Sequence, residues 1–382
     1  MKVLTLIHGF HPVTGGAETA ALEVASRAAA AGIEVVVVTA GAKGLPRRES
    51  IAGVPVFRSP MPPRSLGPMD PGAMLLFALG AVPMVHRLAR EADVLHAHFT
   101  IPAGLMAWAL SCLRRRPYLV TLHGSDVPGY HHERPHAGLY ALTRPLARRV
   151  WRGADRVVAV SEELRQFVAA MEGSLPIEVV PNGVDTHRFA PPPDEAREPG
   201  RILLVGRLIR LKGHSVFLRA LARVHRCWDG PLRAEIIGDG PELEDLRREA
   251  AALGVSDRVD FLGFVPHESL PALYARVSLF VMPSLGEALP MAILEAMASG
   301  LPVVASRVGG IPDVLPESGA LYVPPGDEEA LARAILAVLS EPGKARAMGR
   351  ENRERAAGFH WDVIAMRYVR MYEEIRERAR GR

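Results

Sequence analysis

Residues 201–213 read RILLVGRLIRLKG, a short apolar run followed by a loop that carries two glycines and three cationic side chains. An apolar run of this length that ends at a glycine is typical of a buried strand. The same alternation, of a short run rich in β-branched residues and a longer stretch rich in Ala, Leu and Arg, recurs along the chain. It predicts βα units around parallel sheets, and therefore an α/β fold.

The predicted strands fall into two successive groups, one in each half of the chain. The first group lies near residues 2–7, 34–38, 54–57, 93–97, 118–122, 156–160 and 177–180. The second group lies near residues 201–205, 233–237, 259–262, 278–282, 302–305 and 320–323. Two open parallel sheets are expected. Because ligands bind such sheets at the carboxyl ends of the strands, a cleft would form there if the two domains faced each other.

The boundary between the two halves is marked by residues 181–185, PNGVD, and by residues 191–195, PPPDE. Turn-forming residues and successive prolines disfavour both helix and central strand. We therefore expect one domain over residues 1–185 and a second over residues 186–360. The last stretch, 361–382, carries an apolar stripe at helical spacing that needs a partner surface. Its members are Trp361, Ile364, Tyr368, Met371, Tyr372 and Ile375.

The composition bounds the class of protein. Of the 382 residues, 48% are hydrophobic and 23% are charged, which is typical of globular chains and not of disordered or fibrous ones. Cys112 and Cys227 allow neither a disulfide framework nor a four-cysteine zinc site, which favours a reducing compartment. The longest uncharged runs, 71–85 and 99–113, are shorter than the roughly 18 residues of a membrane span. With no signal peptide ahead of the first strand, a cytoplasmic location is expected.

The formal net charge of +4 is unevenly distributed. In residues 1–190 Lys and Arg outnumber Asp and Glu by 5, whereas in residues 191–382 Asp and Glu are in excess by 1. The arginines that cluster in the first half lack the interleaved aromatic residues of a single-stranded nucleic-acid groove, so no nucleic-acid partner is expected. An anionic substrate or peripheral contact with an anionic membrane fits better, and a solvated face beside a core helix is the alternative. The clustered arginines are Arg114, Arg115, Arg116, Arg144, Arg148, Arg149 and Arg152.

Two glycine-containing loops are candidate anion sites. Gly15 and Gly16 follow the first strand and precede a helix, so the backbone can approach a ligand closely and the helix N-terminus offers free N–H groups. This loop lacks G-x-G-x-x-G, and a tight βα turn is an equally good interpretation. In the second half, Arg207 and Lys212 can converge on a diphosphate, each charge-assisted hydrogen bond contributing about 1.5–3 kcal/mol. A solvated basic loop is the alternative there.

Two carboxylates, Glu287 and Glu295, flank the start of a predicted helix over residues 290–299. Even on one continuous helix they would lie about 12 Å apart along the axis and diverge around it, too far apart for a general acid and base pair. They suit hydrogen bonds to hydroxyls on different parts of one extended ligand. Glu295 lies among apolar residues and needs a partner, either a ligand or a neighbouring arginine.

Histidines offer a further candidate, a metal site. His96 and His98 alternate on a predicted strand and so face one side, but no third ligand is evident, which favours core or cleft-lining side chains. His131, His132 and His136 lie in a Pro-containing loop and are expected at the surface or in a mobile loop rather than in a metal site.

Several motifs occur in a fixed order over nearly the whole chain. They are Gly15-Gly16, TLHGSD at 121–126, PNGVD at 181–185, the loop 206–213, GDGP at 238–241, FLGFV at 261–265 and the two glutamates separated by seven residues. In this order they resemble the retaining family-four glycosyltransferases, whose GT-B architecture has two Rossmann-like domains facing a central cleft. The resemblance implies that the last helix crosses back onto the first domain, which would cover its apolar stripe.

The resemblance also implies a role for each site residue. Arg207 and Lys212 would hold the diphosphate of a sugar nucleotide, and Glu295 its ribose hydroxyls. Glu287 would contact hydroxyls of the donor hexose. Three residues would act near the reacting groups: His123 beside the anomeric centre, Asp126 toward the acceptor, and Gly16 along the donor phosphates and the acceptor. The other donor-binding residues would be Phe264 and Val265 beside the base and Leu289 and Met291 at the start of the helix.

The implied reaction moves a hexose from a UDP- or GDP-linked donor to an acceptor hydroxyl with retention of the anomeric configuration. The acceptor would be a saccharide, a lipid-linked sugar or a small molecule, as in the biosynthesis of polysaccharides, glycolipids or glycosides. The departing phosphate oxygen would take the acceptor proton, so no protein nucleophile, metal or cofactor is expected. A GT-B epimerase or phosphorylase, and a sugar-nucleotide-binding subunit without turnover, remain alternatives.

One departure from the family pattern bears on these alternatives. Family members often have Gly-Phe-Gly after the first glutamate, with free amides toward the hexose and phosphate. Here the sequence is ALP at 288–290, and Pro290 has no N–H to donate. This residue favours the subunit without turnover, and it leaves the donor hexose open.

Overall fold

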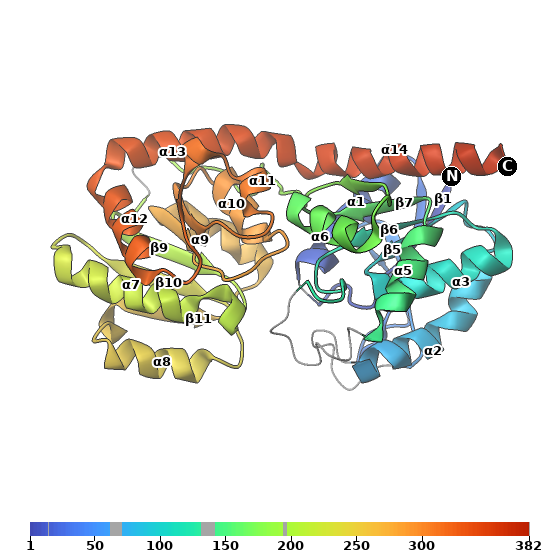
Figure 1. Ribbon diagram of the computed structural model, residues 1–382, viewed down its shortest axis with the longest axis horizontal. Helices are drawn as coiled ribbons and strands as arrows, with labels where there is room; N and C mark the ends of the chain where they lie inside the picture. Colours follow the sequence, from blue (N-terminus) through green and yellow to red (C-terminus); the bar gives the residue numbers. More distant parts are fainter. Residues whose placement is uncertain (14, 62–70, 131–141, 194–196, 382) are drawn as a thin grey trace. The chain divides into compact units, whose positions relative to one another are not determined.

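The protein folds into two compact α/β units, as the computed structural model shows (Figure 1). Unit 1 consists of residues 1–182 together with 361–382, and unit 2 of residues 183–360. Each unit is built on one largely parallel sheet, so the predicted α/β class with two Rossmann-like sheets is confirmed. The structure describes residues 1–13, 15–61, 71–130, 142–193 and 197–381.

Unit 1 has an eight-stranded sheet in the order β3-β4-β2-β1-β5-β6-β7-β8. The order changes direction between β1 and β5, and ligands bind open sheets at such a switch point. All neighbouring strands are parallel except β3 and β4. The strands are β1 (Lys2–Leu6), β2 (Glu34–Thr39), β3 (Arg48–Ile51), β4 (Val54–Arg58), β5 (Val94–His98), β6 (Tyr118–Leu122), β7 (Arg156–Ala159) and β8 (Ile177–Val179).

Strand β3 is absent from the predicted strands. It lies at the edge of the sheet, pairs antiparallel with β4, and joins it through Ala52 and Gly53, both of which have positive φ. A two-residue turn of this kind matches the twist of the paired strands. The sequence of β3, RESI, is short and mostly polar, so it lacks the apolar signal of a buried strand.

Helix α14 (Trp361–Arg380) belongs to unit 1 and runs along α1 (Gly16–Ala30) (Figure 1). Each residue of its predicted apolar stripe is at most 4% exposed. The expected return of this helix to the first domain is thereby confirmed. The other helices of unit 1 are α2 (Pro71–Leu88), α3 (Leu105–Arg114), α5 (Arg144–Gly153) and α6 (Glu162–Glu172), with a π turn, η1 (Thr100–Gly104).

Unit 2 has a six-stranded, wholly parallel sheet in the order β11-β10-β9-β12-β13-β14. Its strands are β9 (Arg201–Val205), β10 (Arg233–Ile237), β11 (Val259–Gly263), β12 (Leu279–Met282), β13 (Val303–Ser306) and β14 (Ala320–Val323). Its helices are α7 (His214–Cys227), α8 (Leu243–Ala252), α9 (Leu270–Arg276), α10 (Met291–Ala298), α11 (Ile311–Val314), α12 (Glu328–Ser340) and α13 (Pro342–Ala356). Short 3₁₀ turns are η3 (Arg210–Lys212), η4 (Ser256–Arg258), η5 (His267–Ser269), η6 (Glu317–Gly319) and η7 (Ala357–Phe359).

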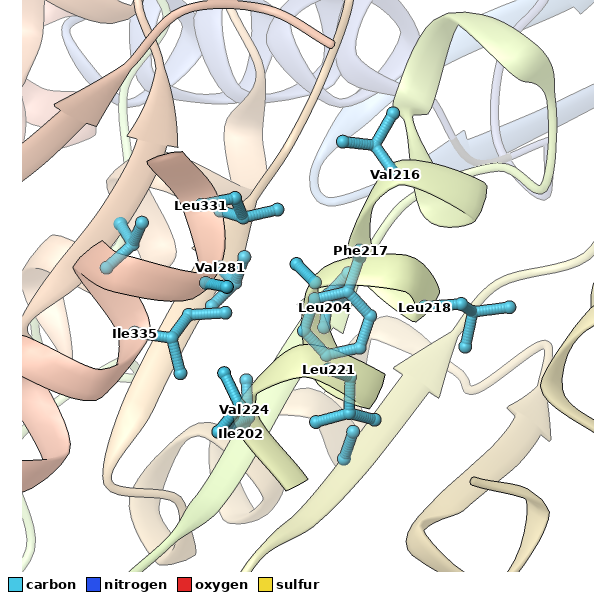
Figure 2. Close-up of a cluster of buried hydrophobic side chains, with 14 of the residues drawn as sticks. Ile202, Leu204, Val216, Phe217, Leu218, Leu221, Val224, Val281, Leu331 and Ile335 are labelled. Carbon is cyan, nitrogen blue, oxygen red and sulfur yellow. The ribbon is translucent and has the colours of Figure 1, made fainter. Parts of the chain in front are cut away.

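The core of unit 2 packs side chains of α7 and α12 against the sheet (Figure 2). Leu204 of β9, Phe217 of α7 and Ile335 of α12 belong to this cluster and are almost wholly buried. Burial of one such side chain contributes about 1.5–3 kcal/mol. The core therefore fixes the strands from whose ends the functional loops emerge.

Candidate active site

The loop that follows β9 is held against the loop that follows β12 at the carboxyl edge of unit 2. The Leu285 N–H donates to the carbonyl oxygen of Leu211 at 2.8 Å. Gly213 has a φ of 69°, and a Cβ there would lie 1.9 Å from the carbonyl oxygen of Pro283. Because only glycine fits this approach and this φ, the sequence fixes where the loop 206–213 turns into α7.

Lys212 and Glu287 form an ion pair across these two loops. The Lys212 Nζ lies 2.6 Å from Glu287 Oε1, which also accepts the hydroxyl of Ser284 at 2.7 Å. The side chain of Lys212 is 18% exposed and that of Glu287 is 7% exposed. Such a pair, largely shielded from water, interacts more strongly than a surface pair. The structure thus brings together Lys212, the residue predicted to bind the diphosphate, and Glu287, the residue predicted to bind the hexose.

Arg207 lies in the same loop as Lys212 but in a different environment. It is exposed, and its guanidinium has no hydrogen-bond or ion-pair partner within the described part of the chain. Unit 2 therefore presents a cation there that its own carboxylates do not neutralise. A planar guanidinium of this kind is suited to phosphate oxygens.

Four other residues predicted to bind the donor lie on two segments of unit 2. Phe264 is 65% exposed, and Val265 is half-buried, directly after β11. Leu289 is buried and Met291 is half-buried, on either side of the N-cap of α10. The aromatic face of Phe264 is therefore accessible to a ligand, whereas Leu289 offers mainly its backbone.

Glu295 lies within α10, as predicted, and is 4% exposed. Its Oε2 accepts the hydroxyl of Tyr274 at 2.9 Å, and its Oε1 lies 2.9 Å from His267 Nε2. Its partners are therefore a tyrosine and a histidine, not the arginine that the sequence left open. Burial raises the pKa of Tyr274 well above its usual range, so this phenol stays a proton donor.

His267 and Tyr274 are absent from the predicted site residues. His267 lies on η5, and its ring contacts Phe189, which in turn contacts the ring of Tyr274. The two residues come from a segment between β11 and β12 that carries no motif. A usable signal was the rule that a buried carboxylate needs partners, but it does not say which residues supply them.

In unit 1, Gly16 is the first residue of α1 and Gly15 is its N-cap. The carboxylate of Glu18 folds back over this loop, since a Cβ at Gly15 would lie 2.3 Å from Glu18 Oε2 and one at Gly9 would lie 2.9 Å from Oε1. A helix N-terminus attracts negative charge, which Glu18 supplies from the first turn. An anionic ligand at this loop would meet that carboxylate as well as the helix amides.

Asp126 ties the loop after β6 to the turn after β5. Its Oδ1 accepts the main-chain N–H of His123 at 3.0 Å, and its Oδ2 accepts the N–H and the hydroxyl of Thr100 at 2.7 and 2.8 Å. Asp126 is 4% exposed, and burial raises the pKa of its carboxyl despite these hydrogen bonds. With both oxygens engaged, Asp126 is suited to positioning His123.

Four histidines of unit 1, His8, His96, His98 and His123, form what we call the histidine cluster. The ring centroids of His96 and His98 lie 4.2 Å apart, and those of His98 and His123 lie 5.3 Å apart. His8 is connected to them through Phe99, whose ring centroid lies 5.3 Å from that of His8 and 4.9 Å from that of His123. Burial lowers the pKa of His8 to about 4 and those of His96 and His123 to about 3, and it holds that of His98 well below its usual range. All four rings are therefore uncharged near neutral pH.

The two histidines of β5 have protein partners. His96 lies 2.7 Å from the hydroxyl of Tyr372 and 2.9 Å from that of Thr121, and the Nδ1 of His98 lies 3.1 Å from the Nε2 of His123. Among the described residues, no three or more His, Cys, Asp or Glu side chains are arranged so that they could hold a metal ion. The three histidines of the Pro-containing loop, His131, His132 and His136, lie outside the residues that the structure describes.

The arginine clusters of the first half are partly neutralised within unit 1. Arg148 and Arg152 both pair with Glu172, whose side chain is fully buried. Arg116 donates to the carbonyl oxygen of Arg90 at 2.6 Å. Over the described residues, none of the helices combines the length and the apolar character that crossing a bilayer requires.

Comparison with known proteins identifies the family. A family model for glycosyl transferases group 1 matches residues 186–355, and one for glycosyltransferase family 4 matches residues 14–188. The chain is 30% identical to a GDP-mannose-dependent alpha-(1-6)-phosphatidylinositol monomannoside mannosyltransferase of Mycobacterium tuberculosis, over 95% of this chain and 96% of that protein. It is 35% identical to the protein of the same description from Mycolicibacterium smegmatis, over 72% and 73% of the two chains.

A solved structure agrees with this result. The sucrose-phosphate synthase from Thermosynechococcus elongatus superposes with a TM-score of 0.84 and 25% sequence identity, over 98% of each chain. The match extends over both units. This chain belongs to family 4 of the glycosyltransferases, the glycosyl transferases group 1, and has the GT-B fold.

Proposed function

We propose that the protein transfers a hexose from a UDP- or GDP-linked sugar to an acceptor hydroxyl, with retention of the anomeric configuration. The observation that carries this proposal is the Lys212–Glu287 ion pair in the same loop system as Arg207, which is exposed and has no partner among the described residues. A nucleoside diphosphate carries more negative charge than one carboxylate, so it competes with Glu287 for Lys212 and gains a second cation in Arg207. Glu287 is then released toward the hydroxyls of the hexose.

The nucleoside end of the donor fits the other residues of unit 2. Glu295 is held rigidly by Tyr274 and His267, and a carboxylate oxygen can accept a second hydrogen bond, here from a ribose hydroxyl. The exposed ring of Phe264 suits the flat face of a base. The acidic group is fixed before the ligand binds, which reduces the entropy cost of binding.

The chemistry needs charge stabilisation more than a protein nucleophile. The bond between the anomeric carbon and the diphosphate breaks, and the acceptor oxygen forms its bond on the same face while its proton passes to the departing phosphate oxygen. Arg207 and Lys212 stabilise the negative charge that develops on the diphosphate. Glu287, released from Lys212 but still bonded to Ser284, would bind a hexose hydroxyl rather than attack the sugar. On unit 1, His123 would contact the hexose, and Asp126 would hold His123.

A lipid-linked or other membrane-associated acceptor is part of this proposal. Leu75, Leu79 and Val82 recur at helical spacing on α2 and are each more than half exposed. An exposed apolar helix face in a unit with a net positive charge is suited to the headgroup region of an anionic bilayer. Liposome flotation would test this contact: loss of retention in a variant with serine at these three positions is expected, and no retention of the unaltered protein contradicts it.

The donor site is tested with a panel of UDP, GDP and ADP and their sugars, read as shifts in melting temperature. Lys212→Ala is expected to weaken binding of the preferred nucleotide by about tenfold or more, because a charge-assisted hydrogen bond is lost. Arg210→Ala, an exposed cation of the same loop, is the matched control and should change it less than about threefold. Equal effects of the two substitutions would contradict the assignment of Lys212.

Turnover separates the proposal from its alternatives. Transfer to an acceptor with retained anomeric configuration, followed by NMR, supports it. Epimerisation of the nucleotide sugar without an acceptor identifies an epimerase, and phosphorolysis of a glycoside identifies a phosphorylase. Nucleotide binding with neither transfer nor slow hydrolysis identifies a binding subunit, which Pro290 at the N-cap of α10 would favour because it supplies no N–H.

A further inference from the structure

The two ring nitrogens of His98 have different surroundings. Its Nδ1 lies 3.1 Å from the Nε2 of His123, whereas its own Nε2 is buried without any hydrogen-bond partner in the described part of the chain. His98 ends β5 and pairs in register with Thr121 of β6, two residues before His123. The contact between the two rings is therefore fixed by the pairing of two central strands.

Only one of two proton arrangements suits these surroundings. An uncharged imidazole carries one N–H and one bare nitrogen. If His123 Nε2 donated to His98 Nδ1, the proton of His98 would sit on its Nε2, a buried N–H without a partner. If His98 Nδ1 donates instead, the unpartnered atom is a bare nitrogen. Buried N–H groups without partners are the rarer of the two in native proteins, so the second arrangement is favoured.

We propose that His98 donates its Nδ1–H to the Nε2 of His123 and so holds His123 in the tautomer that carries its proton on Nδ1. The Nδ1 of His123 has no protein partner among the described residues and is not among the buried unpaired atoms, so it reaches solvent. His123 then presents a hydrogen-bond donor to a ligand, and His98 is the positioning residue that makes it one.

The consequence for catalysis rests on the proposed function. A donor at the Nδ1 of His123 is suited to a hydroxyl oxygen of the transferred hexose. The other tautomer would present a bare nitrogen and would require the hydroxyl to donate instead. His98, which contacts no substrate in this proposal, therefore selects which kind of hydrogen bond the sugar receives.

The tautomer is measured directly on the full-length protein without substrate at pH 7.5. In ¹⁵N-histidine-labelled protein, protonated and bare ring nitrogens resonate far apart, and the signals of His123 are assigned by their loss in His123→Asn. We expect Nδ1 of His123 to be protonated and Nε2 to be bare. A protonated Nε2 of His123 would overturn the proposal.

Two substitutions of His98 show whether this residue determines the tautomer of His123. His98→Phe keeps a ring beside His123 but removes the donor, so we expect the Nε2-protonated form of His123 to appear and kcat to fall about three- to tenfold. His98→Asn keeps an amide N–H near the position of Nδ1 and should retain the tautomer and most of kcat. His225→Phe, the same exchange at a half-buried position of α7, is the control and should change neither measurement.

Each outcome bears on one proposal. A folded His98→Phe variant in which His123 keeps its Nδ1 proton overturns the role of His98. If that variant does not fold, the spectrum of His98→Asn carries the test, and a protonated Nε2 of His123 there overturns the role. If no nucleotide sugar is turned over by the unaltered protein, the proposed function fails, while the ring spectra still decide the proposal about His98.

Discussion

The same edge of the sheet is built differently in the two units. In unit 1 the carboxyl ends of the strands hold the histidine cluster, which is uncharged near neutral pH, and Asp126, whose oxygens are occupied by backbone and hydroxyl groups. In unit 2 the same edge holds the Lys212–Glu287 ion pair and the exposed cation of Arg207. Parallel topology thus provides the edge, and the loops decide its charge.

This difference has a chemical meaning. A sugar and an acceptor hydroxyl are neutral and are recognised by hydrogen bonds from uncharged groups of fixed orientation. A diphosphate is recognised by cations, and an ion pair already present in the protein can be exchanged for it. Changes in the pH, in the backbone and in a single carboxylate test whether the two edges differ in this way.

Acidification should produce the largest difference in stability between the two units. In the unfolded chain imidazole titrates near pH 6.5, and every member of the histidine cluster titrates lower in the folded protein. The unfolded chain therefore binds more protons between pH 6.5 and about 4, and unit 1 loses stability as the pH falls through this range. We expect a loss of several kcal/mol by pH 4.5. Unit 2, where the described residues include one such imidazole, His214, with its pKa lowered to about 4, should lose less.

The tryptophans allow the two units to be followed separately. Trp151 lies in unit 1 and Trp228 in unit 2, so variants that retain one of them as the sole tryptophan report urea unfolding of each unit. Measurements should stop at pH 4.5, because below it the unfolded chain begins to protonate Asp260 and Glu328 of unit 2, whose pKa values in the folded protein are lowered by Arg233 and Arg223, so unit 2 would lose stability as well. Equal losses of stability in the two units would contradict the contrast.

A backbone substitution should perturb the charged edge without changing a charge. Gly309 has a φ of 57°, and a Cβ there would lie 1.8 Å from the carbonyl oxygen of Glu287. Gly309→Ala is therefore expected to cost about 3 kcal/mol or more in the free energy of unfolding of unit 2 and to displace Glu287. Gly326→Ala is the matched control, because its φ of 80° is also positive but a Cβ there would lie 3.8 Å from the side chain of Leu285, an ordinary contact. It should cost about 1 kcal/mol. Equal costs would show that the contact with Glu287 is unimportant.

Removal of the Glu295 carboxylate should have the smallest effect on stability, and it should specifically raise the KM for the donor. Glu295→Ala is expected to raise the donor KM by about ten- to a hundredfold, because hydrogen bonds to a charged group are lost. Glu268→Ala, an exposed acidic residue next to His267, is the control and should leave the KM unchanged. A normal KM in Glu295→Ala would contradict contact with the ribose.

Sequence patterns predicted the fold well because the interior of a parallel sheet leaves a strong apolar signal. Every strand that lies inside a sheet was predicted within a residue or two, and the edge strand β3 was missed because its polar sequence carries no such signal. The helix that contains Glu295 was predicted from Pro290 and Gly300, and it spans Met291–Ala298. Local propensity is enough for features of this kind.

The surroundings of the site residues could not be predicted in the same way. Tyr274 and His267 reach Glu295 from a segment about 20 residues or more away, and Tyr372 reaches His96 from 276 residues away. Such contacts depend on tertiary packing, for which single-sequence periodicity holds no information. The alternation of His96 and His98 predicted core or cleft-lining side chains, and both are buried, but it did not predict the other rings that surround them.

The return of α14 to unit 1 makes that unit discontinuous in the chain, while unit 2 is one continuous segment. During synthesis, the 178 residues of unit 2 must be added before α14 exists, which takes about 10 to 35 s at typical elongation rates. Unit 1 therefore cannot complete its fold until unit 2 has been synthesised, although it comes first in the sequence. Until then Tyr372 cannot bond His96, and the apolar surface of α1 that receives α14 stays exposed to chaperones and to other nascent chains.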